Sequence, residues 1–335
     1  MKEPEWLEKE KKDACRTACA SKVAEPKLLQ KKSKNVKILS LDEMIEKDAK
    51  LAKEAFTKRL IRGTGYAACL TTNFKECNFI FVDKGKKAEL ELLADSSLAM
   101  NFIFIGEGAS LRLFTTVVSD SLNSIEIRLE DNARLDAGLL KHKGTFAYHA
   151  QAATAGTGAS VNSASFWGGS GTGHTLTELR GAESKALHVE LSAAGDSEDI
   201  RLNSKALHAA NSTGSDVIMR GVAQDSSRTF FGGAVAVESN GRGSKSSLEQ
   251  QVLLLDKDAR ADAEPVLEIK NNDVECSHSA AVRQIEEEKL FYMMSRGLGK
   301  DLAKTTIVTG FLRSAMKRIK DKELRNMFMP PFMRD

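Results

Sequence analysis

Hydrophobic and polar positions alternate with a period of two through the middle of the chain, from about residue 78 to residue 272. Residues 88–92 and 124–129 show the alternation most clearly, because every second side chain in them is apolar. Gly, Asn, Asp and Ser separate these short segments, which is the pattern of strands joined by turns. The pattern predicts a mainly β fold. The lack of long helical segments between the strands argues against a doubly wound α/β fold.

A repeat can also be read in this region. Each unit has a polar turn, then a small residue, then an alternating segment. The small residues are alanines that fall 21 to 28 residues apart, at Ala88, Ala109, Ala133, Ala159, Ala182, Ala206, Ala234 and Ala259. Strand-and-turn repeats of this length are typical of a solenoid whose coils stack on one another. An antiparallel sandwich with accidental spacing is the alternative.

Both ends of the chain follow a helical pattern. Residues 1–60 are expected to be helical, and Ser40 with Glu43 forms the sequence of a capping box. After residue 284 we expect three helices. The first covers 286–296, the second covers 300–320, and a short third ends before Pro330. The first helix should turn Leu290, Phe291, Met293 and Met294 inward. We expect a helical N-terminal region (1–65), a β-helix core (66–275) and a helical C-terminal region (276–335).

Charge is distributed unevenly, although the net charge is only +3. Lys and Arg outnumber Asp and Glu by 16 to 11 in residues 1–60 and by 9 to 4 in residues 300–335. Residues 61–299 carry 24 Lys and Arg and 31 Asp and Glu. The basic ends are of mixed sign and lack interleaved aromatic residues, so they predict solvated helix faces and no nucleic-acid binding. No apolar run reaches the ~18 residues of a membrane span. Five cysteines and a polar N-terminus predict a reduced, cytoplasmic chain.

Cys276 and His278 are the main candidates for chemistry. They lie two residues apart in an extended segment, so their side chains should share one face of a strand. A thiolate and an imidazole are ligands that iron–sulfur chemistry uses. A small buried cysteine beside a hydrogen-bonded histidine is the structural interpretation, and the residue types alone favour it.

The remaining candidates favour structural roles. No second cysteine pair completes a tetrahedral site with Cys15 and Cys19, and Cys69 and Cys77 have no neighbouring histidine. The glycine-rich stretch 168–175 lacks the Gly-Lys-Ser/Thr ending of a P-loop, so it predicts a turn and not an ATPase. The other histidines have no metal-binding spacing; they are His142, His149, His174, His188 and His208.

Residues 264–312 closely resemble the SufB/SufD family of iron–sulfur cluster assembly scaffolds. The match includes DVECSH at 273–278, LFYMMSRGL at 290–298 and GFL at 310–312. The resemblance implies a SufBD-type fold, a right-handed parallel β-helix core with helical N- and C-terminal regions. It also implies a scaffold that is not an enzyme, on which a transient iron–sulfur cluster is assembled.

The resemblance further implies partners and site residues. Two SufB/SufD-type subunits are expected to pair through their β-helices, with Cys276 and His278 binding the nascent cluster, as metal ligands, at the subunit interface. Each subunit is expected to bind one SufC-type ABC ATPase through its C-terminal helices, so ATP acts only through that partner. The expected partner-binding residues are Phe291, Tyr292, Arg296 and Phe311. A sulfur donor system is a further expected partner.

The triplet at 276–278 is closer to SufD than to SufB. Ser279 stands where SufB-like chains carry an acidic residue, and no cysteine lies between Cys77 and Cys276, where SufB-like chains carry cysteines inside the β-helix. The resemblance therefore predicts a SufD-like subunit that pairs either with a SufB-type chain or with itself. A solenoid that only binds other proteins is the alternative. A β-helix polysaccharide lyase or hydrolase would need an acidic cluster that the sequence does not show.

Overall fold

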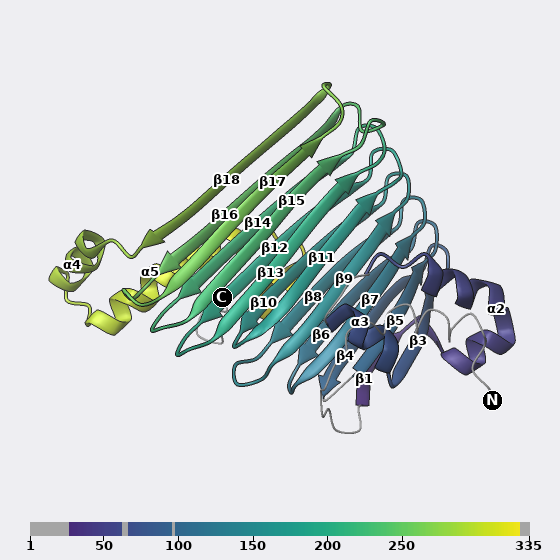
Figure 1. The fold of residues 1–335 in the computed structure, drawn as a ribbon, viewed down its shortest axis with the longest axis horizontal. Coiled ribbons are helices and arrows are strands. Elements are labelled where there is room, and N and C mark those ends of the chain that lie inside the picture. The colour runs from purple at the N-terminus through teal and green to yellow at the C-terminus, as the bar shows by residue number, and fades with distance from the viewer. Residues whose placement is uncertain (1–26, 62–65, 96–97, 329–335) are drawn as a thin grey trace.

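The computed structural model describes residues 27–61, 66–95 and 98–328. They form an elongated β-solenoid with helices at both ends (Figure 1). The N-terminal elements are β1 (Lys27–Lys34), β2 (Lys37–Ser40), α2 (Leu41–Thr57) and α3 (Tyr66–Asn73). The solenoid continues through β3 (Glu76–Val82), β4 (Lys87–Asp95), β5 (Leu98–Ile105), β6 (Ser110–Val117), β7 (Ser121–Leu129), β8 (Arg134–Lys141), β9 (Ala147–Ala155), β10 (Ser160–Gly168), β11 (Gly171–Leu179), β12 (Lys185–Ala194), β13 (Asp199–His208), β14 (Gly214–Ala223), β15 (Arg228–Val237), β16 (Ser244–Leu254), β17 (Arg260–Ile269) and β18 (Val274–Gln284). The C-terminal helices are α4 (Glu287–Ser295), α5 (Lys300–Met316) and α6 (Lys322–Phe328).

Two nine-stranded sheets form the walls of the solenoid. Sheet A has the order β1-β4-β6-β8-β10-β12-β14-β16-β18, and sheet B has the order β17-β15-β13-β11-β9-β7-β5-β3-β2. The chain passes alternately between the sheets, so strands two apart in the sequence pair in parallel. These pairs build about eight coils. The expected β-helix fold with helical ends is confirmed.

A left-handed residue makes the corner that precedes each sheet A strand from β4 to β16. These stacked residues have φ between 57° and 69°, and they are Gly85, Gly108, Asn132, Gly158, Glu183, Ser212 and Gly243. Glycine and asparagine adopt this conformation more easily than other residues. From the second coil onward, the residue that follows is small and buried; these residues are Ala109, Ala133, Ala159, Ser184, Thr213 and Ser244. A small side chain here lets the chain turn over the interior.

The predicted alanine repeat is correct at three of these corners and wrong at others. Ala109, Ala133 and Ala159 occupy the corner, but Ala206 and Ala234 lie within β13 and β15. Hydroxyl residues replace alanine in the later coils, and the coils also lengthen. Residues that contact each other in neighbouring coils are 23 sequence positions apart for Lys84 and Glu107, and 31 positions apart for Thr213 and Ser244. An alanine at a nearly constant spacing therefore no longer falls at the corner in the later coils.

The N-terminal segment contains strands where the sequence predicted helix. β1 pairs antiparallel with β4, and β2 pairs antiparallel with β3. Hydrogen bonding to the open edge of the first coil outweighs the weak helical pattern of residues 27–40, because strand preference depends on context. The capping box is confirmed, since the Glu43 N–H donates to Ser40 Oγ at 3.3 Å and the Ser40 N–H donates to Glu43 Oε2 at 2.7 Å.

Helices cover opposite faces of the solenoid at its two ends. α2 and α3 bury Met44, Phe56 and Leu70 against the outer face of sheet B. α5 and α6 bury Leu312 and Leu324 against the outer face of sheet A. The rest of the outer face of sheet B carries no described helix (Figure 1). None of the described helices combines the length and apolarity that a bilayer span requires.

The solenoid interior is apolar in its first coils and partly polar farther on. Ile103, Ile127 and Leu135 belong to the apolar part. The polar part is built from inward-facing residues of the later strands, including His149, Gln151, Ser163, His188, Glu190, Ser204 and His208. Buried polar groups persist when they hydrogen-bond one another. Gln151 donates to Ser163 at 2.9 Å and His188 lies 2.8 Å from the Ser204 hydroxyl, whereas His149 Nδ1 has no hydrogen-bond partner among the described residues.

Candidate functional site

The last coil of the solenoid is open. β18 pairs with β16, and β17 pairs with β15, and within the described residues neither strand has a partner on its other edge. Both strands are exposed along most of their length. Figure 1 shows them at the end of the solenoid opposite α2. An exposed pair of strand edges is a template for pairing with another chain.

Cys276 and His278 both lie in β18, as partners of Ser246 and Leu248 in β16. Ser246 and Leu248 are buried and face the interior. Side chains in register on parallel strands point to the same face, so Cys276 and His278 also face inward at the open end. The prediction that they share one face is confirmed. Cys276 is half-buried against the interior, and His278 is exposed.

Burial raises the pKa of the Cys276 thiol, and a backbone hydrogen bond from Ser246 works against that shift. A thiol with a raised pKa is mostly protonated at neutral pH and is a weak nucleophile. A bound metal ion displaces the thiol proton. The geometry therefore suits a cysteine that becomes a ligand when metal arrives better than a cysteine that is reactive in the free chain.

Two donors from one chain do not complete a metal site. Within the described residues, no group of three or more His, Cys, Asp or Glu side chains is placed to hold a metal ion. Iron–sulfur clusters are commonly held by four protein ligands. Cys276 and His278 could supply half of such a set for a cluster that is the cargo of the site, and a second chain would have to supply the rest.

A basic groove of about 840 Å³ crosses the outer face of sheet A and reaches β18. Lys185, Lys245 and Lys320 line it, together with Arg318, which pairs with Asp216 at 2.7 Å. Lys245 pairs with Glu275 at 2.8 Å. The positive charges of the groove exceed the negative ones, so it lowers the energy of anions near the end of the solenoid.

The expected partner-binding residues separate into two groups. Phe291 and Tyr292 are 73% and 58% exposed on α4, and Arg296 lies 5.1 Å from the Tyr292 ring. No residue of α4 is buried, and the predicted inward positions of Phe291 and Met294 are wrong, because both side chains are exposed. The helix extends beyond the sheets (Figure 1), which leaves its apolar residues uncovered. Phe311, by contrast, packs on sheet A beneath Arg220 at 5.7 Å.

The other candidate residues have structural surroundings. His188 is fully buried, and its two ring nitrogens lie 2.8 Å from the hydroxyls of Thr177 and Ser204. Burial lowers the pKa of His149, His188 and His208 to about 4. Cys77 lies in the core under the N-terminal helices. Cys15 and Cys19 lie outside the described residues, as does the side chain of Cys69.

The glycine-rich stretch 168–175 forms the end of β10, a turn and the start of β11. Its Gly169 has a φ of 77°, in the left-handed region. Gly173 faces the interior, where an added Cβ would lie 2.6 Å from Trp167. The glycines therefore form a corner and make room for a tryptophan, as the missing P-loop ending indicated.

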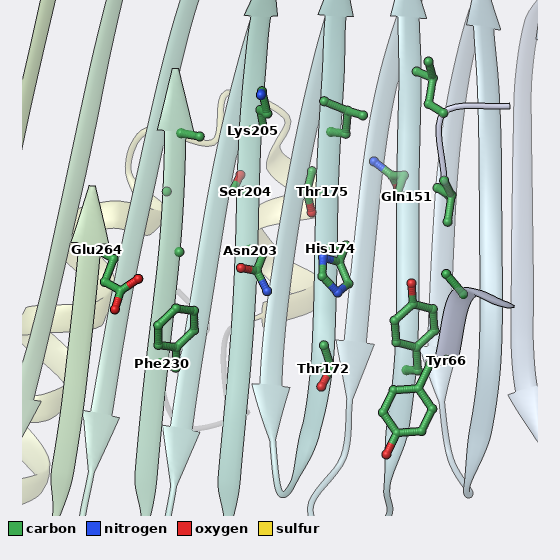
Figure 2. A pocket seen from close by; sticks show the side chains of 18 of the residues that line it. Tyr66, Gln151, Thr172, His174, Thr175, Asn203, Ser204, Lys205, Phe230 and Glu264 are labelled. Carbon is green, nitrogen blue, oxygen red and sulfur yellow. The ribbon is translucent and has the colours of Figure 1, made fainter. Parts of the chain in front are cut away.

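Sequence reasoning missed one feature, a groove of about 700 Å³ on the outer face of sheet B. Its residues come from the segment after α2, from α3 and from five strands (Figure 2), so no short motif contains them. The signal available in the sequence was a histidine, an asparagine and a glycine at outward positions of successive repeats. Only the correct register aligns His174, Asn203 and Gly232.

Residues 90–311 match the family described as SUF system FeS cluster assembly, SufBD core domain. An iron–sulfur cluster assembly SufBD family protein of Mycobacterium leprae is 29% identical over 238 residues, which are 68% of this chain and 26% of that protein. A Mycobacterium tuberculosis protein of the same description is 31% identical over 211 residues, 60% of this chain and 24% of that protein. A Staphylococcus haemolyticus relative is 24% identical over 306 residues, 83% of this chain and 64% of that protein.

The chain thus spans about a quarter of the mycobacterial relatives and 64% of the staphylococcal one. The family match covers most of the solenoid and reaches α5. It includes the open last coil with Cys276 and His278. This chain belongs to the SufBD family of the SUF system for iron–sulfur cluster assembly.

Proposed function

We propose that this chain is a SufD-like scaffold subunit of a SUF complex, and that it holds a nascent iron–sulfur cluster without catalysing a reaction itself. The observation that carries the proposal is the placement of Cys276 and His278 on the inward face of the open last coil. A soft thiolate and an imidazole at an unpaired strand edge are donors that a second subunit can complete. Ser279 beside them favours the SufD-like assignment.

The partner would be a SufB-type chain or a second copy of this chain, joined through the edges of β17 and β18. Val266, Ile269 and Val282 support this proposal, because each is at least 40% exposed on these strands. Such side chains favour burial in an interface. In a homodimer, a two-fold axis would bring two thiols and two imidazoles together, which is a four-ligand set.

A SufC-type ABC ATPase would dock on α4 through Phe291, Tyr292 and Arg296. The exposure of both aromatic rings supports this, since a helix that buries nothing is stabilised by a partner. Phe311 would act indirectly by fixing α5 to sheet A. ATP would act only through that ATPase, whose closure would move α4 relative to the solenoid. The helical C-terminal region would be the docking unit, and β18 would belong to the core.

Sulfur would arrive from a donor system through the partner subunit. Cys77 and Cys276 are separated by a stretch without cysteine, so the coils before the last one offer no cysteine between these two as a sulfur acceptor. Cys276 would then act as a ligand at the junction. A reduced, cytoplasmic compartment suits a thiol in this role.

The proposal is tested by anaerobic co-purification with a SufC-type ATPase and a SufB-type chain. We expect a stoichiometric complex that contains iron and sulfide. The double variant Cys276→Ala, His278→Ala should keep the complex and lose most of the iron and sulfide. The matched control is Cys77→Ala with His142→Ala, a buried cysteine and an exposed histidine away from the last coil.

Three outcomes would contradict parts of the proposal. Iron and sulfide that survive in the Cys276, His278 variant would move the ligands elsewhere. Equal loss in the control variant would indicate a general loss of folding. Recovery of this chain without the ATPase would favour the alternative function, a solenoid that only binds other proteins.

A further inference from the structure

The basic groove on the outer face of sheet A crosses six neighbouring strands, from β8 to β18. Five strand spacings separate these two strands, so the groove is roughly 24 Å long. Its volume is about 840 Å³. A groove of this length suits an extended segment of about seven residues better than a single small ion.

A row of exposed cations runs along the floor of this groove. Arg134, Lys185 and Lys245 lie near the start of β8, β12 and β16. The register places Ser160 between the first two and Gly214 between the last two. A cation therefore recurs on every second strand, roughly 10 Å from the next. An added Cβ at Gly214 would meet nothing closer than 3.8 Å, so the floor between the two lysines is open.

The segment that follows α5 forms one wall of the groove and adds two further cations. Arg318 and Lys320 line the groove, whereas Ile319 between them is 2% exposed and packs with α5 and α6 against sheet A. The next residue, Asp321, pairs with Arg112 at 3.1 Å. These contacts fix the wall to the solenoid, so its two cations keep their positions beside the floor.

The carboxylates that line the groove are each paired with one of its cations. Asp216 accepts a hydrogen bond from Arg318 at 2.7 Å, and Glu275 pairs with Lys245 at 2.8 Å. All four side chains are at least 40% exposed. Exposed ion pairs contribute little to stability, so Arg318 and Lys245 can exchange these carboxylates for those of another molecule.

Two other cations of the groove are left over. Among the residues that the structure describes, no carboxylate pairs with Lys185 or Lys320. Arg134 pairs with Asp136 at 2.7 Å. The groove therefore has more positive charge than the neighbouring carboxylates neutralise, and its potential favours an acidic ligand.

We propose that this groove binds an extended acidic segment of a partner protein. A polyproline II segment has three residues per turn, so every third side chain lies on one face, about 9.3 Å from the next. That spacing matches the roughly 10 Å between Arg134, Lys185 and Lys245. Acidic residues at every third position would each face one cation, and the open floor at Gly214 leaves room for the backbone. A compact anion cannot reach all three cations, because the outer two are roughly 19 Å apart.

The test measures the binding of two fluorescently labelled peptides to the purified chain by fluorescence polarisation at low ionic strength. One peptide has three Pro-Pro-Glu repeats, and the other has the same composition with its three glutamates adjacent. We expect the repeat peptide to bind about tenfold more tightly, since only its carboxylates match the spacing of the cations. Added salt should weaken its binding.

A double variant tests the two cations that have no carboxylate partner. Lys185→Glu with Lys320→Glu should weaken binding of the repeat peptide at least about tenfold, because two attractions become repulsions. Both side chains are exposed, so the melting temperature should change little. Lys257→Glu, at an exposed lysine of the turn between β16 and β17, is the matched control and should bind as the parent does.

Three results would overturn the proposal. Equal affinity for the two peptides would show that the spacing of the cations selects nothing. An equal loss of binding in the control variant would show that only the overall charge of the chain matters. Tighter binding of a single-stranded DNA of ten thymidines than of the repeat peptide would assign the groove to nucleic acid.

Discussion

His188 is neutral inside the solenoid, because burial lowers its pKa from 6.5 to about 4. The folded chain therefore binds this proton less readily than the unfolded chain does. The stabilisation is present above pH 6.5 and is lost as the pH falls toward 4. Between pH 7 and pH 5 the free energy of unfolding should fall by about 2 kcal/mol from this residue.

The variant His188→Gln measures this contribution. Glutamine can still hydrogen-bond the hydroxyls of Thr177 and Ser204, but it does not titrate. From urea denaturation, the free energy of unfolding of the variant should rise by about 2 kcal/mol relative to that of the parent between pH 7 and pH 5, because only the parent loses the His188 contribution. A pH-independent difference for His188→Gln would contradict the argument.

Glu126 shows the opposite dependence. Burial raises its pKa to about 7, although Glu126 accepts hydrogen bonds from the backbone N–H groups of Leu60 and Ile61 at 3.1 and 2.6 Å. The folded chain binds this proton more readily than the unfolded chain, so stability is lost as the pH rises from 4.5 through 7. Glu126→Gln should therefore gain stability relative to the parent between pH 5 and pH 8. Thermal unfolding of the variant and the parent at pH 5 and pH 8 measures this gain. A difference in stability between the two proteins that is the same at both pH values would contradict the prediction.

The shared face of Cys276 and His278 was predictable because its signal is local. Cys276 and His278 are two apart in one strand, so alternation alone placed them on one face. Their inward direction could not be predicted, since it depends on the register with β16. His174, Asn203 and Gly232 lie far apart in the sequence and meet only through sheet pairing. Surface grooves of that kind require the register before they can be recognised.

At the scale of elements, local rules located the strands but not the edges of the sheets. The alternation and the capping box at Ser40 and Glu43 depend on neighbouring residues, and both were predicted correctly. β1 and β2 were mistaken for helix, because they are strands only through pairing with the first coil. The exposure of α4 was likewise not predicted, because its apolar residues follow a helical pattern although none of them is buried.

The exposed helix α4 leads to a prediction about its partner. If the proposed docking surface is correct, Phe291→Glu with Tyr292→Glu should abolish co-purification of a SufC-type ATPase, because two charges would replace the proposed apolar anchors. Neither residue is buried in the chain, so the melting temperature should change little. Val118→Glu, at an exposed apolar residue of the β6–β7 turn, is the control. Retention of the ATPase by the double variant would place its docking surface elsewhere.

The whole molecule is a solenoid with one covered end and one open end. β1 and β2 close the first coil, whereas β17 and β18 end without a further described strand. Val266 and Val282 on these last strands are 45% and 40% exposed. Proteins commonly protect exposed edges with charged residues, especially lysine. The apolar residues here therefore favour continued pairing with another subunit.

Lysine at these two positions should prevent that pairing. Val266→Lys with Val282→Lys places like charges at a contact that would otherwise be apolar, and both side chains are already partly solvated, so the fold should persist. Sedimentation velocity with a SufB-type chain, and with this chain alone, should show complexes for the parent and monomers for the variant. Val118 is 40% exposed, as Val282 is, but it lies away from the last coil, so the variant Val118→Lys should still pair. If the double variant pairs as the parent does, the subunits meet at another surface, and Cys276 and His278 cannot share a cluster across these edges.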